Sequence, residues 1–183
     1  SELLVTKWCS DNNVLCSVIR APLIVGINPS GSLGNLISAI KENRFILPGN
    51  GDARKSMVLA SDIATWVSNS RDVHGIYNLT DQADPSYFEI FEAITDCLDL
   101  PHVRSVPKSF MAAVGLAGHL AGKLRFNSAP YNLQIHNQLT NSLTFSSKLA
   151  SKHDWHPEAV TKNSSEWLIY SNYLNQLPTT KAK

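Results

Sequence analysis

The first part of the chain alternates between helix-type and strand-type apolar patterns. Residues 1–12 place Leu4 and Trp8 about one turn apart, which predicts the end of an amphipathic helix. After a polar break, the apolar run at 14–19 is typical of a parallel strand covered on both faces. Three glycines and two prolines within 20–34 predict a loop after that strand. A helix, a short turn and a buried strand in succession indicate an α/β layer fold.

The rest of the chain continues this mixture of short strands and helices. An aspartate before a proline, Asp84-Pro85, predicts a helix start, and apolar residues recur behind it at helical spacing. We find no internal repeat and no low-complexity linker. Helices are expected at 33–43, 61–66, 85–98, 107–124, 131–139, 147–153 and 163–175, and short strands at 44–47, 56–59, 76–79 and 143–145.

Composition and charge narrow the function classes. Of the 183 residues, 43% are hydrophobic and 17% are charged, which is typical of a globular protein. Lys plus Arg number 16 against 15 for Asp plus Glu, so the chain lacks the basic excess of a nucleic-acid binder. Any anionic ligand must therefore be met by a few placed cations or by backbone N–H groups.

The cysteines and the apolar stretches indicate the cellular compartment in which the protein is expected. Cys9, Cys16 and Cys97 form no Cys-x-x-Cys pair, which favours free thiols in a reducing compartment over a zinc or redox site. The longest weakly charged stretch, 109–122, is too short to span a bilayer, and residues 1–5 do not resemble a secretory signal. These features predict a soluble, cytoplasmic protein. Because the first residue is not Met, we expect a fragment, a processed product or a trimmed chain.

Two segments match motifs of a known enzyme family. The opening sequence SELL leads through a strand into RAPLIVG at 20–26, and the glycine turn GNGDARKSMV at 49–58 precedes SDIA at 61–64. They resemble the extended short-chain dehydrogenase/reductase family. There, the helix with the catalytic Tyr-x-x-x-Lys precedes the sixth sheet strand and its Arg-Pro-rich exit. The second segment is similar to the family's Gly-Asp-Gly…Arg-Asp-Phe-Val…Asp-Asp-Ile-Ala stretch.

Two later segments continue the resemblance in the same order. Residues 75–79, GIYNL, are close to the family's Tyr-Asn-Leu-Gly strand. Residues 143–157 are similar to its closing pattern, in which a short helix ends in Leu-Gly-Trp-x-Pro. Together the four segments cover residues 1 to about 158. Their shared order supports the resemblance more than any single motif does.

The resemblance implies the C-terminal portion of an extended Rossmann-type fold, with the last parallel strands and a small α/β substrate-binding lobe. Residues 1–26 would end the Rossmann-type domain. Residues 27–183 would form mainly the substrate-binding lobe, with 55–80 and the last helices returning to the core sheet. The implied function is that of an NAD(P)-dependent nucleotide-sugar epimerase or dehydratase acting on UDP-sugar-like substrates. The RKSMV stretch is similar to bacterial members associated with surface polysaccharide synthesis.

Two motifs of the family are missing from this sequence. It contains no Gly-x-x-Gly-x-x-Gly loop to hold a dinucleotide pyrophosphate at a helix N-terminus, and no Tyr-x-x-x-Lys. In the family the tyrosine acts as acid and base on a sugar hydroxyl while the nicotinamide takes and returns hydride. We therefore expect NAD or NADP in the complete enzyme, but no tight cofactor binding and no catalysis by this chain alone.

The resemblance places the substrate-binding residues in the lobe. Asn35 and Leu36 occupy the place of a backbone-and-amide contact to the diphosphate, although they also suit an ordinary helix start. Ile46, Leu47 and Pro48 match the strand whose backbone pairs with the nucleobase, and they would look the same as plain strand residues.

One of two adjacent cations is expected to meet the diphosphate. Lys55 takes that place in a gap-free alignment, whereas Arg54 is better suited to bidentate phosphate contact. The sequence does not separate them, and a solvated turn is the alternative. Near the end, Ile135 to Gln138 replace the arginine and the acidic residue that the family often adds, which leaves open a ligand other than a typical UDP-sugar.

Further residues are expected to border the cofactor or to hold structure. Ala21, Pro22, Leu23 and Ile24 fall where family members border the nicotinamide, and they carry no reactive group. His153 and His156 form an HxxH, but their place in the closing motif favours a structural role, so we expect no metal site.

Two function hypotheses remain, together with an expectation about assembly. The chain is either the substrate-binding part of the enzyme or a non-catalytic module that binds or senses nucleotide sugars. The steroid and flavonoid reductase branch is disfavoured by the polar turn at 49–55. An apolar strand without its parallel neighbours exposes an edge, so residues 1–26 are expected to pair with a second copy or to pack differently from the family.

Overall fold

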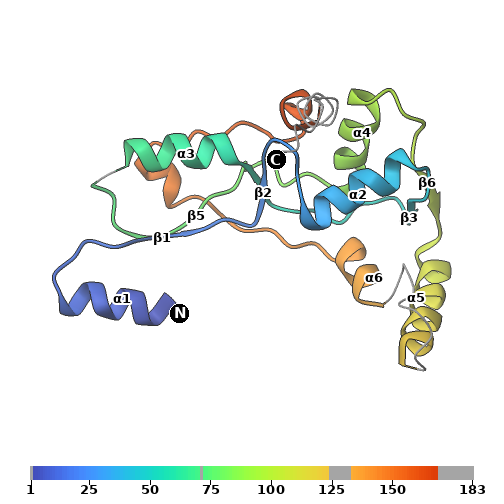
Figure 1. Ribbon diagram of the computed structural model, residues 1–183, viewed down its shortest axis with the longest axis horizontal. Helices are drawn as coiled ribbons and strands as arrows, with labels where there is room; N and C mark the ends of the chain where they lie inside the picture. Colours follow the sequence, from blue (N-terminus) through green and yellow to red (C-terminus); the bar gives the residue numbers. More distant parts are fainter. Residues whose placement is uncertain (1, 71, 124–132, 169–183) are drawn as a thin grey trace, which may run out of the picture. The chain divides into compact units, whose positions relative to one another are not determined.

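The structure is a computed structural model that describes residues 2–70, 72–123 and 133–168 (Figure 1). The α/β class predicted from the sequence is confirmed, and the strands form three parallel pairs. The elements are α1 Glu2–Asp11, β1 Ser17–Arg20, β2 Leu23–Val25, α2 Gly31–Lys41, β3 Ile46–Pro48, β4 Met57–Leu59, α3 Ala60–Asn69, β5 Gly75–Asn78, α4 Tyr87–Cys97, β6 Arg104–Val106, α5 Lys108–Lys123, α6 Leu133–Thr140 and the 3-10 helix η1 Ala150–His153.

The chain divides into two compact units. Unit 1 consists of residues 1–26, 56–84 and 145–160. Unit 2 consists of residues 27–55, 85–144 and 161–183. Each unit is assembled from segments that lie far apart in the sequence, so its core forms only when these segments come together.

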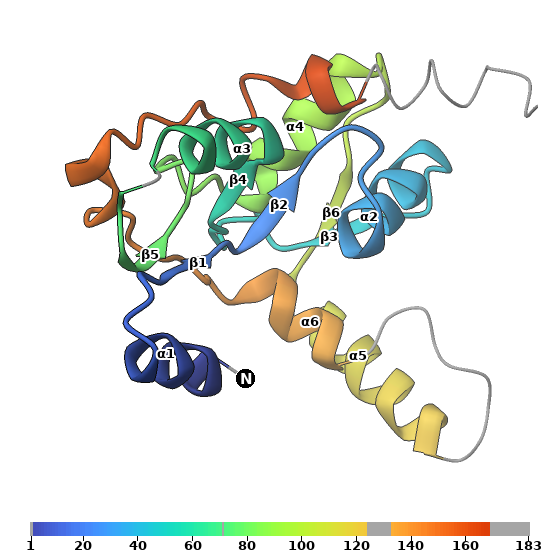
Figure 2. The ribbon, with the colours of Figure 1, turned by 60° about the vertical axis from the view of Figure 1, so that its left-hand side comes forward.

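In unit 1, β1 pairs with β5 and β2 pairs with β4, both in parallel (Figures 1 and 2). The buried core of the unit is aromatic. Trp66 of α3 packs edge-on against Tyr77 of β5 and against Trp155, with ring centroids 5.5 and 6.2 Å apart. The other members of this core are Val58, Leu79 and Ala150.

Two indole N–H groups attach the segment 145–160 to the rest of unit 1. Trp155 Nε1 donates to the Thr80 carbonyl at 2.9 Å, and Trp66 Nε1 donates to the His153 carbonyl at 2.7 Å. The Asp81 carboxylate accepts the N–H of Val160 at 3.2 Å. Burial raises the pKa of Asp81, and the backbone N–H groups that it accepts oppose this shift.

In unit 2, β3 pairs in parallel with β6, with Ile46 opposite Arg104 and Pro48 opposite Val106. The helices α2 and α4 each bury one apolar face. Phe91 of α4 packs against Phe45, which precedes β3, with ring centroids 4.8 Å apart. The helices α5 and α6 lie side by side (Figures 1 and 2).

Several expectations about local structure were wrong. The loop expected at 20–34 contains β2, and β6 was not expected at all. Residues 143–145 form no strand and make one bridge, between Lys55 and Leu143. The apolar run at 14–19 is not covered on both faces, because Val14 and Leu15 are exposed and β1 begins only at Ser17. The last expected helix is helical at 164–168, and its remainder lies outside the described residues.

Candidate functional site

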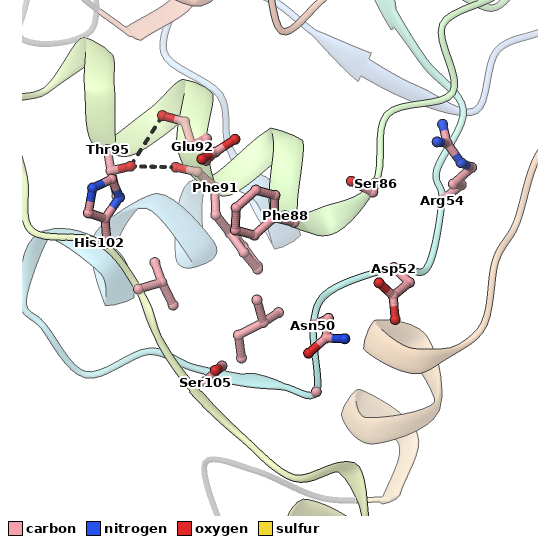
Figure 3. A pocket seen from close by; sticks show the side chains of 13 residues that line it. Asn50, Asp52, Arg54, Ser86, Phe88, Phe91, Glu92, Thr95, His102 and Ser105 are labelled. Carbon is pink, nitrogen blue, oxygen red and sulfur yellow. Dashed lines mark hydrogen bonds between the residues drawn. The ribbon is translucent and has the colours of Figure 1, made fainter.

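A cavity of about 860 Å³ lies in unit 2, bounded by β3, the turn after it, α4 and the segment leading into β6 (Figure 3). This volume is within the range of small-molecule sites, which is roughly 300–1,000 Å³. The lining residues are Leu47, Gly49, Asn50, Asp52, Arg54, Ser86, Phe88, Phe91, Glu92, Thr95, His102, Val103 and Ser105.

The centre of the cavity is apolar, and aromatic rings dominate it. Leu47 and Phe91 are buried beneath it at 3% and 2% exposure. Phe88, in the first turn of α4, is 48% exposed, so its ring is available to a ligand. Phe88 and Phe91 lie between two polar ends of the cavity (Figure 3).

The turn at 49–52 approaches α4 closely. Gly51 has φ +71°, and the Phe88 N–H donates to its carbonyl at 3.1 Å. A Cβ on Gly51 would lie 2.9 Å from the Phe88 nitrogen, so a side chain there requires the backbone to move. Glycine at this position therefore allows the turn to rest on α4 and sets the spacing of the cavity wall.

The N-terminus of α4 is capped by its own side chains. Ser86 and Glu89 form a capping box, in which the Ser86 N–H donates to Glu89 Oε2 at 2.7 Å and the Glu89 N–H donates to Ser86 Oγ at 3.2 Å. These hydrogen bonds, with a smaller contribution from Arg54, lower the pKa of Glu89. Because the N–H groups of Ser86 and Glu89 are already hydrogen-bonded within the cap, we expect a side chain to supply the positive charge for an anionic ligand at this end of α4.

Arg54 supplies that charge at one end of the cavity. Its backbone bridges to Ser86, and its N–H donates to Ser142 Oγ at 3.0 Å. The side chain is 53% exposed, and its Nη1 is 4.0 Å from Glu89 Oε2. At that distance and exposure this ion pair contributes little to stability.

The neighbouring Lys55 has different surroundings. Its Nζ donates to the Asn141 carbonyl at 3.1 Å and lies 5.7 Å above the centre of the Tyr87 ring. Burial lowers the pKa of Lys55. Successive side chains of an extended segment point to opposite sides, so Arg54 lines the cavity and Lys55 does not.

The other end of the cavity carries Glu92, Thr95 and His102 (Figure 3). The Thr95 hydroxyl lies 3.0 Å from the Phe91 carbonyl and 3.2 Å from the Glu92 carbonyl, so it bonds to its own helix. The Glu92 carboxylate and the His102 ring therefore provide most of the polar chemistry at this end. Sequence reasoning missed both residues, and it missed Phe88, an aromatic side chain outside the apolar helical pattern of α4.

The structure separates the residues that the sequence placed in one substrate site. Leu47 and Arg54 line the cavity. The remaining candidates in unit 2 do not line it, and their exposure differs: Asn35 and Ile46 are exposed, Leu36 and Lys55 are half-buried, and Pro48 is buried.

The residues expected to border the cofactor lie in unit 1. Ala21 packs against the aromatic core, and Pro22 follows β1. Leu23 and Ile24 belong to β2, and Ile24 is 53% exposed. None of these four side chains carries a group that could bind a phosphate or move a proton.

The HxxH pair also lies in unit 1, beside a smaller cavity of about 460 Å³. The ring of His153 packs edge-on against Tyr77, and its Nε2 is 3.4 Å from the Tyr77 hydroxyl. Within the described part of the chain, no group of three or more metal-ligating side chains occurs. No helix among the same residues is long and apolar enough to cross a membrane.

Comparison by sequence identifies no relative, because no family model and no curated protein match this chain. Comparison of structures does. A UDP-N-acetylglucosamine 4-epimerase from Bacillus cereus matches with a TM-score of 0.65 at 12% identity, covering 97% of this chain and 52% of its own. The same enzyme from Methanobrevibacter ruminantium, in complex with UDP-N-acetylmuramic acid, matches at 0.62 and 17%, covering 96% and 51%.

A third match is UDP-glucose 4-epimerase from Thermus thermophilus in complex with NAD, at a TM-score of 0.61 and 14% identity, covering 93% of this chain and 51% of its own. The chain thus spans about half the length of these solved structures. The fold predicted from the resemblance, part of the Rossmann-type fold of nucleotide-sugar epimerases, is confirmed. At these identities the likeness establishes the fold alone.

Proposed function

We propose that this chain is the substrate-binding part of an NAD(P)-dependent nucleotide-sugar epimerase or dehydratase, and that it is inactive by itself. The observation that carries the proposal is the position of Arg54, a half-exposed guanidinium at the edge of an apolar-floored cavity. A planar guanidinium recognises phosphate oxygens in pairs, and the apolar floor suits the rest of a nucleotide. The fold match to epimerases whose solved complexes contain UDP-N-acetylmuramic acid or NAD supports the same substrate class.

The residues of this chain do not suffice to hold the cofactor. The four candidates at 21–24 are apolar, and the sequence contains neither the glycine-rich loop nor Tyr-x-x-x-Lys. NAD or NADP, when bound in the complete protein, would supply hydride transfer. The contribution of this chain is to hold and orient the substrate through unit 2. A non-catalytic module that binds nucleotide sugars would use the same cavity.

Calorimetric titration of the chain with UDP, UDP-sugars and NAD, each separately, tests the proposal. We expect binding of UDP and UDP-sugars without binding of NAD. Arg54→Ala should weaken UDP binding about tenfold or more, because hydrogen bonds to charged groups contribute roughly 1.5–3 kcal/mol. Lys55→Ala is the matched control and should bind nearly as well as the unaltered chain, since its ammonium does not line the cavity. A folded chain that binds no UDP ligand would refute the proposal.

We also propose that the apolar face of α1 meets a second copy of the chain. Leu3, Leu4 and Trp8 of this helix are 85%, 74% and 59% exposed, which is costly in water. Light scattering after size-exclusion chromatography should give the mass of a dimer, and Trp8→Glu should give a monomer. A monomer at high concentration for the unaltered chain would contradict this assembly. We propose in addition a cytoplasmic location, which rests on the free cysteines, and a role in surface polysaccharide synthesis, which rests on the sequence resemblance.

A further inference from the structure

One face of α1 is turned toward the strand that follows it in the sequence. Within this helix, Glu2, Thr6 and Cys9 are buried or half-buried, and every other residue is exposed. These three positions are spaced by four and then three residues, so they lie on one side of the helix. The chain reverses its direction between α1 and β1 (Figure 1). The helix therefore rests on the rest of unit 1 through a single narrow face.

The strand carries the partners of this face. Cys16, Val18 and Arg20 are two residues apart, so in an extended segment their side chains point to the same side. At one end Arg20 Nη2 donates to Glu2 Oε1 at 2.6 Å. At the other end the thiols of Cys9 and Cys16 form a hydrogen bond. The helix thus lies back along the strand with a contact at each end.

The lengths of the two segments agree with this arrangement. The helical path from Glu2 to Cys9 rises about 10 Å. The extended path from Cys16 to Arg20 spans about 13 Å. When the helix lies back along the strand, an ion pair at one end brings the two cysteines together at the other. The meeting of the two thiols therefore follows from the packing of α1.

Backbone hydrogen bonds hold both cysteines in place. Asn13 takes φ +53° and turns the chain back at the end of α1, and the Val14 N–H then donates to the Cys9 carbonyl at 2.9 Å. The Gly75 N–H donates to the Cys16 carbonyl at 2.9 Å, which fixes Cys16 to the start of β5. Ordered backbone on both sides thus presents the two sulfur atoms to each other.

The two thiols differ in their access to solvent. Cys9 is 7% exposed, whereas Cys16 is half-buried. Burial and the neighbouring Cys16 thiol raise the pKa of Cys9, so Cys9 stays protonated at neutral pH. Cys16 is therefore the thiol that meets an oxidant first, and Cys9 is placed to react with the oxidised Cys16.

We propose that Cys9 and Cys16 are a reversible redox pair, and that an intrachain disulfide between them fixes α1 against β1. With hydrogen peroxide as the oxidant, the Cys16 thiolate attacks one peroxide oxygen and the O–O bond breaks. This gives a sulfenic acid on Cys16 and a hydroxide, which takes up the proton that Cys16 released. The Cys9 sulfur then attacks the Cys16 sulfur, the S–O bond breaks, and the departing hydroxide leaves with the Cys9 proton as water. Two thiols and one peroxide thus give one disulfide and two waters, and a small dithiol reverses the change by exchange.

The disulfide changes how firmly α1 is held. In the reduced chain the ion pair of Arg20 with Glu2 joins side chains that are 54% and 39% exposed, so it contributes little. A covalent link at the other end of the helix removes the conformations in which α1 swings away. The exposed apolar residues of α1, Leu3, Leu4 and Trp8, are then held in one orientation. The disulfide needs neither a nucleotide nor a second copy of the chain to form.

Trypsin digestion separates the proposed disulfide from any other. Cleavage after Lys7 and Arg20 leaves Cys9 and Cys16 together in the peptide 8–20, and Cys97 in a different peptide. The full chain is equilibrated with glutathione and glutathione disulfide at a series of ratios, or treated with hydrogen peroxide. The remaining thiols are blocked with iodoacetamide, and the peptides are measured by mass spectrometry. We expect the peptide 8–20 to lose two hydrogens and to take up no label, while Cys97 is labelled.

Three comparisons test whether the fold brings the thiols together. The folded chain should form the disulfide at a glutathione disulfide concentration about tenfold lower than the chain in concentrated urea. Cys97→Ser is the matched control and should oxidise like the unaltered chain, whereas Cys16→Ser should leave Cys9 labelled. Hydrogen exchange of the α1 amides should slow by about tenfold on oxidation and recover when dithiothreitol reduces the bond.

Three results would overturn the proposal. The first is a peptide 8–20 that keeps both labels at glutathione ratios that oxidise the unfolded chain, or a bond that involves Cys97 or joins two copies. The second is equal ease of oxidation in the folded and the unfolded chain, because the packing of α1 would then not bring the thiols together. The third is unchanged hydrogen exchange in α1 after complete oxidation, because the disulfide would then not fix the helix.

Discussion

Replacing Trp155 with phenylalanine tests whether the aromatic core holds the segment 145–160 in unit 1. Trp155 is 2% exposed, donates to the Thr80 carbonyl at 2.9 Å and packs edge-on against Trp66. Phenylalanine keeps an aromatic ring but lacks the N–H. Thr80 is itself 1% exposed, so its carbonyl would lose this donor in a place that water reaches poorly.

The expected loss of stability follows from two contributions. An unsatisfied buried polar group costs about 1–3 kcal/mol. The smaller ring leaves a cavity of roughly 40 Å³, which at about 24 cal/mol per Å³ adds about 1 kcal/mol. We therefore expect Trp155→Phe to lower the free energy of unfolding by about 2–4 kcal/mol, a large part of a typical total of roughly 5–15 kcal/mol.

Urea unfolding followed by far-ultraviolet circular dichroism measures this change. Trp8→Phe, measured at a protein concentration low enough to give the monomer, is the control, because Trp8 is 59% exposed in the single chain and the same chemical change there should alter stability by about 0.5 kcal/mol or less. Combining Trp155→Phe with Trp66→Phe should reveal a coupling of about 0.5–1.5 kcal/mol from the edge-on contact. If Trp155→Phe has no greater effect than Trp8→Phe, the reasoning is refuted.

Three further predictions concern the wall of the cavity. Gly51→Ala should destabilise the chain by about 1–2 kcal/mol or more in urea unfolding, because φ is +71° and the new Cβ would meet the Phe88 backbone; unchanged stability would contradict the close approach. Ser86→Ala should cost about 1 kcal/mol by removing the cap of α4, measured as a lower melting temperature; an equal melting temperature would exclude the capping box. The pKa of Glu89 is lowered in the folded state, so its contribution is present above the unfolded pKa of glutamate, about 4.3, and is lost as the pH falls through the folded pKa. Urea titrations from pH 6 to pH 3 should therefore show a shallower decline in stability for Glu89→Gln than for the unaltered chain, and equal slopes would refute the assignment.

The helices were largely predictable because their signals are local. The apolar spacing of α2 and α4 repeats within a few residues, and the observed helices at Gly31–Lys41 and Tyr87–Cys97 overlap the expected ones. The start of α4 was placed wrongly at Asp84-Pro85. Ser86 is the true N-cap, because Asp84 takes φ +44° and accepts a hydrogen bond from the Ser56 hydroxyl. Asp84 therefore bonds to Ser56, which is distant in the sequence, and does not act as the N-cap of α4.

The short strands were not fully predictable, since a three-residue strand is defined by its partner. The strands β2 and β6 lie in stretches that resemble loops, and each becomes a strand by pairing with a segment more than thirty residues away. The choice between Arg54 and Lys55 has the same origin. Both residues are cations in the same turn. The tertiary structure places Arg54 at the cavity and Lys55 against the Asn141 carbonyl, and this difference depends on the segments that surround them.

By itself, the sequence determined the α/β class, most helices and the resemblance to nucleotide-sugar epimerases. These follow from the spacing of the apolar residues, the helix caps and the order of the motifs, which are all local or sequential features of the chain. Only the tertiary structure decided which side chains share the cavity. Three of them, Phe88, Glu92 and His102, lie in α4 or in the segment between α4 and β6. The other two, Leu47 and Arg54, lie in a segment roughly forty residues earlier. Burial and the pairing of parallel strands bring these segments together, and a local sequence pattern does not predict which distant segments come into contact.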